Sequence, residues 1–319
     1  MPSNTEIEAF VAVARQGGVT RAAEVLHRSQ PAISRRIGQL EAKLGAPLLD
    51  RGAGPVGLTE AGRIFLPHAE AALAALKDGA AAVAGLEDEQ RGGISLAIVG
   101  TLADSPVIAA LQTFLRARPG IELDLRTATS AEVSELVRRG EVALGMRYDP
   151  PASDGLEVHD IGEEPLQLVC APDHALAGRR LRRLDKLAGE RWLVFPTTRS
   201  RPNTVLNLAT QALLKAGLDA PRHMIVDSLN AQKRLVEAGF GIAMMPESAA
   251  REELRRGSLA AIDAPELRLS QRVAALHRRK GYLNGPARAL LAELTSRGST
   301  PISAKAGRAS PSAGTRPHP

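Results

Sequence analysis

The sequence TRAAEVLHRSQPAISRRIGQLEAKLG, residues 20–45, decides the fold of the N-terminal part of this chain. It predicts a short helix that Thr20 can cap, a three-residue turn, and a longer helix that starts after Ser29 and ends at Gly45. Pro31 falls in the first turn of the longer helix, where its missing N–H costs little. The apolar stripe of this helix consists of Ile33, Ile37, Leu40 and Leu44. Two helices joined by such a turn predict a helix-turn-helix unit.

The second helix of this unit presents polar groups opposite its apolar stripe. Arg35 points outward, and Gln30 and Ser34 flank it near the start of the helix. An amide, a hydroxyl and a guanidinium can all bond base edges, and the guanidinium can bridge both acceptors of guanine. We therefore expect a DNA-binding surface made of Thr20, Arg21, Ser29, Gln30, Pro31, Ser34, Arg35, Arg36 and Arg51. The alternative for the same pattern is a helical bundle with a solvated basic face.

Segments on both sides extend the unit to a domain over residues 1–58. Ile7, Phe10, Val11 and Ala14 repeat at helical spacing and predict a first helix that ends at Gly17-Gly18. Apolar runs at residues 47–51 and 55–58 flank a glycine-rich stretch and predict a small hairpin. Helices followed by such a hairpin form a winged helix-turn-helix.

The charge of the chain indicates an anionic partner, but its distribution weakens that argument. The chain has 41 Lys and Arg against 35 Asp and Glu, a formal net charge of +6. Residues 15–63 hold eight basic and four acidic residues. Residues 297–319 hold four basic residues and no acidic one, in a segment of Ser, Pro, Gly and Ala that we expect to be disordered. Net charge therefore only supports the case that the outward residues make.

A long helix is expected over residues 59–90, where Thr59 can cap a helix that runs to about Leu86. Pro67 should bend it near its start. The helix carries a coiled-coil spacing of apolar residues that predicts dimerisation through Leu66, Ala69, Leu73, Leu76, Ala80 and Val83. The alternative is a helix that packs this stripe on its own domain.

Apolar runs alternate with helical patterns from residue 91 to 296 and predict an α/β domain with largely parallel sheets. Strands are expected at residues 94–99, 121–125, 142–146, 166–170, 192–195, 224–226, 242–245 and 273–276, and helices at 105–117, 130–139, 204–216 and 228–238. We divide the domain into lobe I, residues 91–163 and 268–296, and lobe II, residues 164–267. Residues 297–319 remain as the tail.

Hydroxyl-bearing loops follow several of these strands, at the ends where ligands bind in open parallel sheets. They contribute Gly100, Thr101, Thr129, Ser130, Thr197, Thr198 and Ser228. Hydroxyls and backbone N–H groups at helix starts favour an anion such as a carboxylate. Each hydroxyl taken alone is more often a helix cap, so the hypothesis of an effector site depends on their convergence.

Several spaced blocks resemble the DNA-binding domain of LysR-type transcriptional regulators. They are residues 10–14, 20–23, 29–35, 40–45 and 58–62, and they cover about 60 residues. The resemblance implies that Gln30, Pro31, Ser34 and Arg35 contact DNA, that the long helix dimerises, and that the assembly is commonly a tetramer. Val19, where a larger residue is usual, and the wing tip at residues 52–55, which lacks basic residues, depart from the family pattern.

Residues 164–177 and 227–246 resemble, more loosely, the inducer-binding half of the same family. That half is a two-lobed, Rossmann-like domain similar to type II periplasmic binding proteins. The resemblance implies that Thr101, Ser130, Thr198 and Met245 lie in or near an effector cleft.

These observations predict a cytoplasmic transcriptional regulator that binds double-stranded DNA as a homodimer or homotetramer and responds to a small-molecule effector, with an organic anion favoured. We expect no cofactor and no catalytic residues. No HxxxH or HExxH spacing suggests a metal, and the single Cys170 excludes an intramolecular disulfide and a cysteine-based zinc site. One alternative is a small-molecule binding protein whose helical module only oligomerises. Another is an enzyme that uses the cleft, which the lack of a nucleophile–base pair disfavours.

Overall fold

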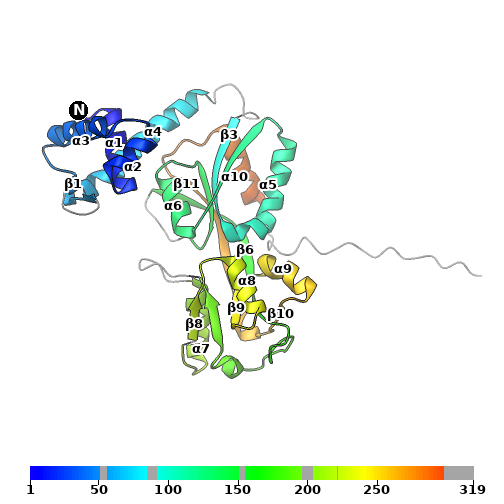
Figure 1. Cartoon of the computed structure of the whole chain (residues 1–319). Coiled ribbons are helices and arrows are strands. Elements are labelled where there is room, and N and C mark those ends of the chain that lie inside the picture. The colour runs from blue at the N-terminus through cyan, green and yellow to red at the C-terminus, as the bar shows by residue number, and fades with distance from the viewer. Residues whose placement is uncertain (51–55, 85–91, 151–154, 196–203, 221, 298–319) are drawn as a thin grey trace, which may run out of the picture.

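The computed structural model of the chain describes residues 1–50, 56–84, 92–150, 155–195, 204–220 and 222–297. These residues form an N-terminal domain, a long helix α4 and a two-lobed C-terminal domain (Figure 1). Arg51, the wing tip, Thr197, Thr198 and most of the expected tail lie outside the described residues. Arg297, which we assigned to the tail, is the last residue of a helix.

The N-terminal domain is built on three helices, α1 (Asn4–Gln16), α2 (Val19–Val25) and α3 (Gln30–Leu44). Phe10 and the predicted stripe residues Ile33, Ile37 and Leu40 are at most 1% exposed and form its core. The helix-turn-helix prediction is therefore confirmed. Two details were wrong: Leu44 is 37% exposed because it is the last residue of α3 and lies beyond the core, and Thr20 does not cap α2. Gly18 is the N-cap of α2, because its extended backbone puts the helix start at Val19.

The predicted hairpin is present as two short antiparallel strands, β1 (Leu49–Asp50) and β2 (Gly57–Leu58). Leu48 and Leu49 are buried in the core of the N-terminal domain. The carboxylate of Glu41 on α3 accepts hydrogen bonds from the backbone N–H groups of Leu48, at 2.8 Å, and Leu49, at 3.2 Å. These bonds attach the hairpin to α3.

The predicted long helix is α4 (Glu60–Ala84), which continues through Pro67. Thr59 caps it by accepting a hydrogen bond from the N–H of Gly62 at 3.0 Å. Leu66, Ala69 and Leu73, half of the expected dimerisation seam, pack on the core of the N-terminal domain instead, and Ala69 is only 1% exposed. The core of the N-terminal domain therefore covers this half of the seam, which is not available to a second copy of the chain.

A second side of α4 lies against lobe I of the C-terminal domain. Glu70 forms ion pairs with Arg15 at 3.0 Å and with Arg139 at 3.1 Å. Asp78 accepts hydrogen bonds from the guanidinium of Arg278 at 2.5 Å and from the N–H of Tyr282 at 3.2 Å. The N-terminal domain and α4 are thus docked on lobe I by buried or half-buried charges.

Lobe I contains a sheet with helices on both faces. Its elements are β3 (Gly92–Val99), η1 (Gly100–Asp104), α5 (Pro106–Ala117), β4 (Ile121–Ala128), α6 (Ser130–Arg138), β5 (Leu144–Tyr148), β11 (Ser270–Arg278) and α10 (Gly285–Arg297). Helices α5 and α10 cover one face and α6 covers the other. Strands β4, β3 and β5 are parallel neighbours in that order.

Lobe II repeats this arrangement around the buried indole of Trp192. Its elements are η2 (Leu184–Leu187), β7 (Arg191–Val194), α7 (Thr204–Lys215), β8 (Arg222–Ile225), α8 (Leu229–Glu237), β9 (Ile242–Pro246), α9 (Glu247–Arg256), β10 (Ala260–Ala261) and η3 (Pro265–Leu267). Strands β8, β7 and β9 are parallel neighbours. Within the described residues, no helix is long and apolar enough to cross a membrane.

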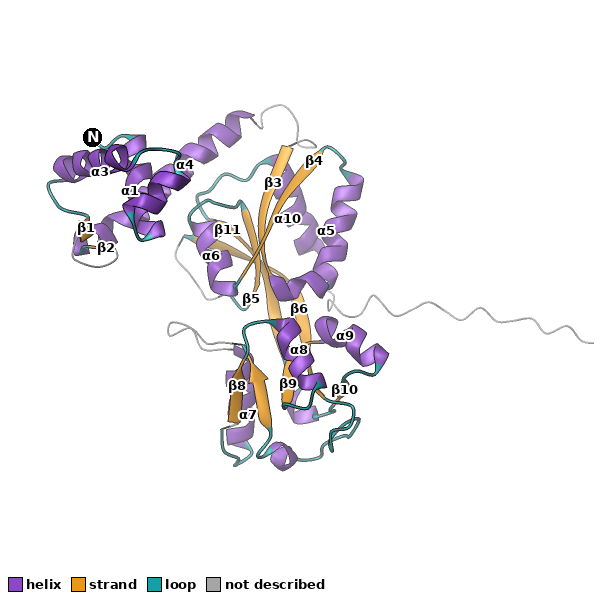
Figure 2. Ribbon diagram, viewed as in Figure 1, coloured by secondary structure: helices purple, strands orange, loops and turns teal. Residues whose placement is uncertain are grey.

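The strand β6 (Leu156–Cys170) passes through both lobes (Figure 2). Its first ten residues pair with β11 of lobe I, and residues 166–169 pair with β9 of lobe II, both antiparallel. The prediction of largely parallel sheets was therefore wrong at the centre, where antiparallel crossing strands join two parallel groups. Only residues 166–170 of this strand were predicted, because the earlier residues are mostly polar and lack an apolar run.

We predict that Gly62→Ala destabilises the joint between the hairpin and α4. A Cβ atom at residue 62 would lie 2.1 Å from the carbonyl oxygen of Leu48, so the backbone must shift. Urea unfolding followed by circular dichroism should show a loss of about 1–3 kcal/mol in the free energy of unfolding. The matched control is Gly79→Ala in the same helix, where a Cβ meets nothing within 4 Å. That change should stabilise by about 0.4–1 kcal/mol, and equal effects of the two variants would contradict the packing argument.

Candidate nucleic-acid interface and ligand site

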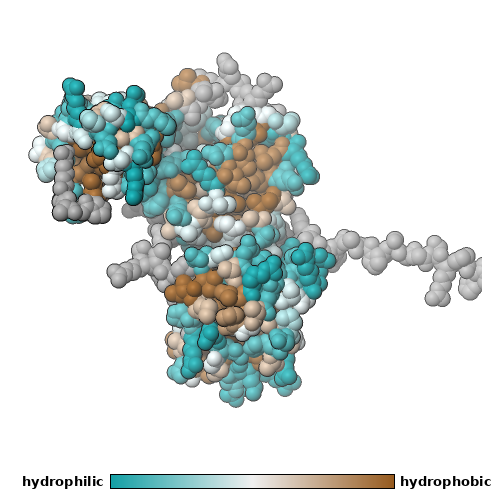
Figure 3. All heavy atoms as spheres, in the orientation of Figure 1, coloured by the Kyte–Doolittle hydropathy of each residue, from teal (hydrophilic) through white to brown (hydrophobic). Residues whose placement is uncertain are grey.

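The outer side of α3 is a polar, solvent-exposed surface. Ser29, Gln30, Pro31, Ser34 and Arg35 are all exposed, and Arg36 is half-buried. On the face of the molecule drawn in Figure 3, hydrophilic atoms cover most of the outside of the N-terminal domain. The structure thus brings the described members of the expected DNA-binding set together along the start of α3 and the adjacent α2.

A direct contact orders the polar groups at the start of α3. The side-chain amide of Gln30 donates a hydrogen bond to the hydroxyl of Thr20 on α2, at 2.7 Å. Thr20 therefore lies beside Gln30, although it does not cap its helix. His27 turns the chain between the two helices with a φ of 51°, a left-handed conformation. The hydrogen bond and the tight turn together position the exposed end of α3 relative to α2.

Four guanidinium groups on this surface form no ion pair within the described part of the chain. Among the described residues, the side chains of Arg21, Arg28, Arg35 and Arg36 have no hydrogen bond or ion pair. Other basic residues of the domain are paired within the chain, as Lys43 is with Glu6 at 2.8 Å and Arg63 with Glu60 at 2.7 Å. The available positive charge of the domain is therefore concentrated on α2, α3 and the turn between them, where it can neutralise phosphates.

The carboxyl ends of the strands in each lobe lie at the junction between the lobes (Figure 2). Val99 at the end of β3 pairs with Ala128 at the end of β4, so Gly100 and Thr129 follow side by side. In lobe II, Ser228 follows β8 and Ser248 follows β9. The structure therefore gathers the described members of the expected effector set at two facing edges, except Met245.

Three members of that set have local roles in the structure. Thr129 accepts a hydrogen bond from the N–H of Glu132 at 3.4 Å, and the N–H of Thr129 donates to the Glu132 carboxylate at 2.8 Å. Ser228 caps α8 by accepting from the N–H of Ala231 at 3.4 Å. Met245, near the carboxyl end of β9, is 1% exposed, and its side chain packs in the core of lobe II.

A buried polar cluster at the junction was missed from sequence. Tyr148 at the end of β5, Glu164 on β6 and Ser248 in the first turn of α9 are between 1% and 7% exposed. The N–H of Ser248 donates to the Glu164 carboxylate at 3.3 Å. The hydroxyls of Tyr148 and Ser248 and one carboxylate oxygen of Glu164 have no hydrogen-bond partner among the described residues. Such atoms are expensive to bury without a partner and point to a polar ligand or water.

The cluster disfavours negative charge on its own groups. Burial raises the pKa of Glu164, against the lowering effect of the neighbouring Ser248. Burial and the charge of Glu164 raise the pKa of Tyr148, while the hydroxyl of Thr101 lowers it. These neighbours come from η1, β5, β6 and α9, so the cluster joins the two lobes. No local motif links its members, which is why sequence reasoning did not find them.

The backbone beside this cluster is strained at Asp149, which has a φ of 39°. Its N–H donates to the carbonyl of Arg272 on β11 at 2.8 Å, and its carboxylate accepts from the N–H of Arg272 at 3.1 Å. Burial raises the pKa of Asp149. A left-handed non-glycine residue held by two bonds at a junction is typical of a functional site.

Two other features lie away from the junction. A groove lined by Arg191, Arg222 and Phe240 lies at the amino ends of β7 and β8, the side of a parallel sheet where ligands seldom bind. Cys170 is fully buried, and burial followed by the charges of Glu190 and Asp173 raises the pKa of its thiol to about 11. A buried thiol with this pKa is a poor nucleophile.

Comparisons with known proteins agree on both halves of the chain. Residues 5–63 match a family model described as bacterial regulatory helix-turn-helix protein, lysR family, and residues 87–299 match the LysR substrate binding domain. The HTH-type transcriptional regulator CbbR of Rhodospirillum rubrum is 29% identical over 91% of this chain and 94% of its own length. The HTH-type transcriptional regulator CfxR of Cupriavidus necator is 28% identical over 81% of this chain and 80% of its own.

Solved structures share the whole arrangement. The crystal structure of CbnR, described as a LysR family transcriptional regulator, has a TM-score of 0.64 and 27% identity, and the match covers 92% of this chain and 98% of that one. Full-length CbnR in a complex with its target DNA has a TM-score of 0.63 and 27% identity, with coverage of 92% and 99%.

We predict that Glu164→Gln stabilises the protein without its effector at neutral pH. Because the pKa of Glu164 is raised in the folded state, that state binds the proton more tightly than the unfolded chain does, and the ionised carboxylate destabilises the fold. The contribution is therefore fully present below the ordinary pKa of 4.5 and is lost as pH rises through the raised pKa. Urea unfolding should show a higher free energy of unfolding for the variant near pH 7.5, and the gain should shrink toward about pH 4. Glu163→Gln, on the exposed neighbour, is the control, and a gain that does not change with pH would count against this account.

Proposed function

The chain belongs to the LysR family of bacterial transcriptional regulators, and on that premise we propose that α3 reads duplex DNA under the control of a small molecule bound between the lobes. The observation that carries the DNA-binding role is the set of guanidinium groups without an ion pair on α2, on α3 and in the turn between them. Arg35 and Gln30 contact base edges, and Arg21, Arg28 and Arg36 neutralise phosphates. The structure of CbnR in a complex with its target DNA supports the DNA-binding role.

The oligomer uses the outer half of the seam on α4. Leu76 and Val83 are 59% and 70% exposed, and Ala80 between them is exposed too. At about 100° per residue, this stripe lies roughly opposite Glu70, Ala74 and Asp78, which face lobe I. A second copy can therefore pair along α4 without displacing lobe I. A homodimer formed in this way, or a homotetramer built from two, presents two recognition helices to DNA.

The effector binds at the buried polar cluster between the lobes. The hydroxyls of Thr101, Tyr148 and Ser248 can donate hydrogen bonds to one carboxylate. This donor set supports the organic anion expected from sequence. The supporting residues are those of the cluster, while Thr129 and Ser228 position the helices that border it.

The effector signal reaches DNA through α4. A ligand that contacts both lobes favours one arrangement of the lobes over others. Lobe I holds α4 at Asp78 and Glu70, so a change in the lobes changes the placement of the two recognition helices on their half-sites. In this role the protein catalyses no reaction, and its partner places it in the cytoplasm with the nucleoid.

Arg35→Ala should relax sequence discrimination. Loss of a bidentate base contact costs about 1–3 kcal/mol for the preferred site and little for other sequences. Fluorescence anisotropy with an operator duplex and a scrambled duplex, over a range of salt concentrations, measures both affinities. Arg28→Ala is the matched control, because loss of a phosphate contact should weaken both duplexes alike and reduce the salt slope by about 1. If Arg35→Ala behaves like Arg28→Ala, Arg35 does not read bases. If no duplex binds the unaltered chain in a salt-dependent way, the module only oligomerises.

A thermal-shift screen of small organic acids and their neutral amides should identify the effector class. A ligand at about 100 times its Kd adds about 2.7 kcal/mol of stability, which is a clear shift in Tm. Tyr148→Phe and Ser248→Ala should weaken the shift, because each removes a donor. Thr129→Ala should lower the basal stability by about 0.5–2 kcal/mol as a lost cap but leave the ligand-induced shift intact. Shifts from amides alone would overturn the anion assignment, and an undiminished shift in Tyr148→Phe would overturn the site.

A further inference from the structure

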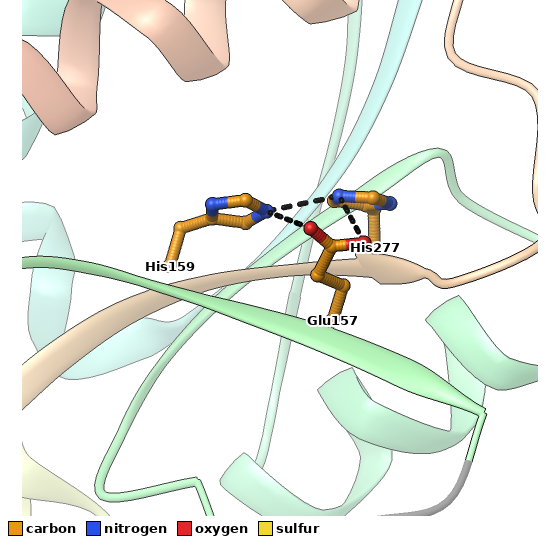
Figure 4. Close-up of side chains that lie close together, drawn as sticks. All are labelled: Glu157, His159 and His277. Carbon is orange, nitrogen blue, oxygen red and sulfur yellow. Dashed lines mark hydrogen bonds and ion pairs between the residues drawn. The ribbon is translucent and has the colours of Figure 1, made fainter.

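Three potential metal ligands meet on lobe I, away from the lobe junction. Glu157 and His159 lie on β6, and His277 lies on the adjacent strand β11 (Figure 4). The strand register puts His277 opposite Glu157 and Ala275 opposite His159. Residues two apart on one strand share a face with the residue opposite them, so the three side chains stand on the same face of the sheet.

The ligand atoms of the Glu157–His159–His277 cluster converge on one point. The Nε2 atoms of the two histidines are 3.0 Å apart. One carboxylate oxygen of Glu157 is 3.6 Å from His159 Nε2, and the other is 3.8 Å from His277 Nε2. Two ligand atoms that share one zinc ion at about 2.0–2.1 Å stand roughly 3–3.5 Å apart. The cluster needs only small side-chain rotations to reach that spacing.

The hydrogen bond of the His277 ring orients it as in a metal ligand. Its Nδ1 lies 2.9 Å from the backbone carbonyl oxygen of Arg278 and donates to it, because a carbonyl can only accept. The proton is thereby fixed on Nδ1, and the Nε2 lone pair points into the cluster. Metal-binding histidines commonly have their second nitrogen held in this way, which orients the ring and raises its basicity.

The surroundings of the cluster allow an ion to enter a rigid site. The side chains of His277, His159 and Glu157 are 11%, 28% and 48% exposed. The two rings stack with centroids 5.0 Å apart and an interplanar angle of 16°. Val273 and Ala275 of β11 and Ile161 of β6 belong to the main core of lobe I, so the strands beneath are fixed by packing.

A purely structural histidine pair would need only the hydrogen bond between the two rings. Here the carboxylate of Glu157 also lies near both rings, with one oxygen beside each. It adds a negative charge that a neutral histidine pair does not require. Two imidazoles and a carboxylate form a set that Zn²⁺, Co²⁺ and Ni²⁺ accept.

We propose that Glu157, His159 and His277 bind a divalent transition-metal ion on lobe I. The site stands one residue from Arg278, whose guanidinium pairs with Asp78 of α4 and whose carbonyl holds His277. A bound ion therefore fixes β11 at the point where it anchors α4. The site does not depend on the DNA-binding role or on the effector site.

The test is metal titration of the full-length protein purified without a polyhistidine tag and treated with a chelator. Co²⁺, followed by its visible absorption, and Zn²⁺, followed by calorimetry, should each bind at one ion per chain. His159→Gln and His277→Gln should each weaken binding by at least about tenfold. His223→Gln, at an exposed position on β8, should leave the affinity unchanged.

Glu157→Gln guards against loss of folding, because this side chain is half exposed and its removal leaves the core intact. The melting temperature without metal should match that of the unaltered chain, while the rise in melting temperature on adding Zn²⁺ should shrink. Absence of stoichiometric binding would overturn the proposal. So would binding that both His159→Gln and His277→Gln retain, since the ion would then sit elsewhere on the surface.

Discussion

The C-terminal domain depends on the hydrogen bonding of one strand in two lobes. Strand β6 pairs with β11 up to Pro165 and with β9 from Leu166 onward, so a single extended segment sets the position of each lobe relative to the other. Glu164 lies at this crossing, and its burial between Tyr148 of lobe I and Ser248 of lobe II follows directly. The Glu157–His159–His277 cluster depends on the same strand, because Glu157 and His159 lie on β6 before the crossing and face His277 of β11.

Helix α4 has a different environment on each of its sides. Leu66, Ala69 and Leu73 are part of the N-terminal core, Glu70, Ala74 and Asp78 face lobe I, and Leu76 and Val83 face solvent. Gly140 of lobe I, with a φ of 65°, approaches Ala74 so closely that a side chain at residue 140 would collide with it. The helix is thus shared by the N-terminal domain and lobe I, and its apolar stripe is divided between a buried and an exposed half.

Features set by residues close together in the sequence could be predicted, and features set by residues far apart could not. The helix-turn-helix could be predicted because Ile33, Ile37 and Leu40 repeat within one helix and because Gly45 ends it. The errors there, at Thr20 and Leu44, concern single residues at helix ends. Only the structure showed which basic side chains are available to DNA. Lys43 and Arg63 are paired within the domain, while Arg21, Arg28, Arg35 and Arg36 have no ion pair among the described residues. In lobe I, the polar first part of β6 carries no apolar run that would reveal a strand.

The sequence by itself determined the winged helix-turn-helix, the capped long helix, the alternation of strands and helices, and the polar side of α3. Each of these is set by side chains within a few residues of one another, through periodicity, caps and turns. Only the tertiary structure decided which half of the α4 stripe stays exposed, which hydroxyls are caps, and which polar groups meet between the lobes. It also brought His159 within 3.0 Å of His277, 118 residues away along the chain. Such contacts depend on strand register and on the packing of distant segments, which local spacing does not encode.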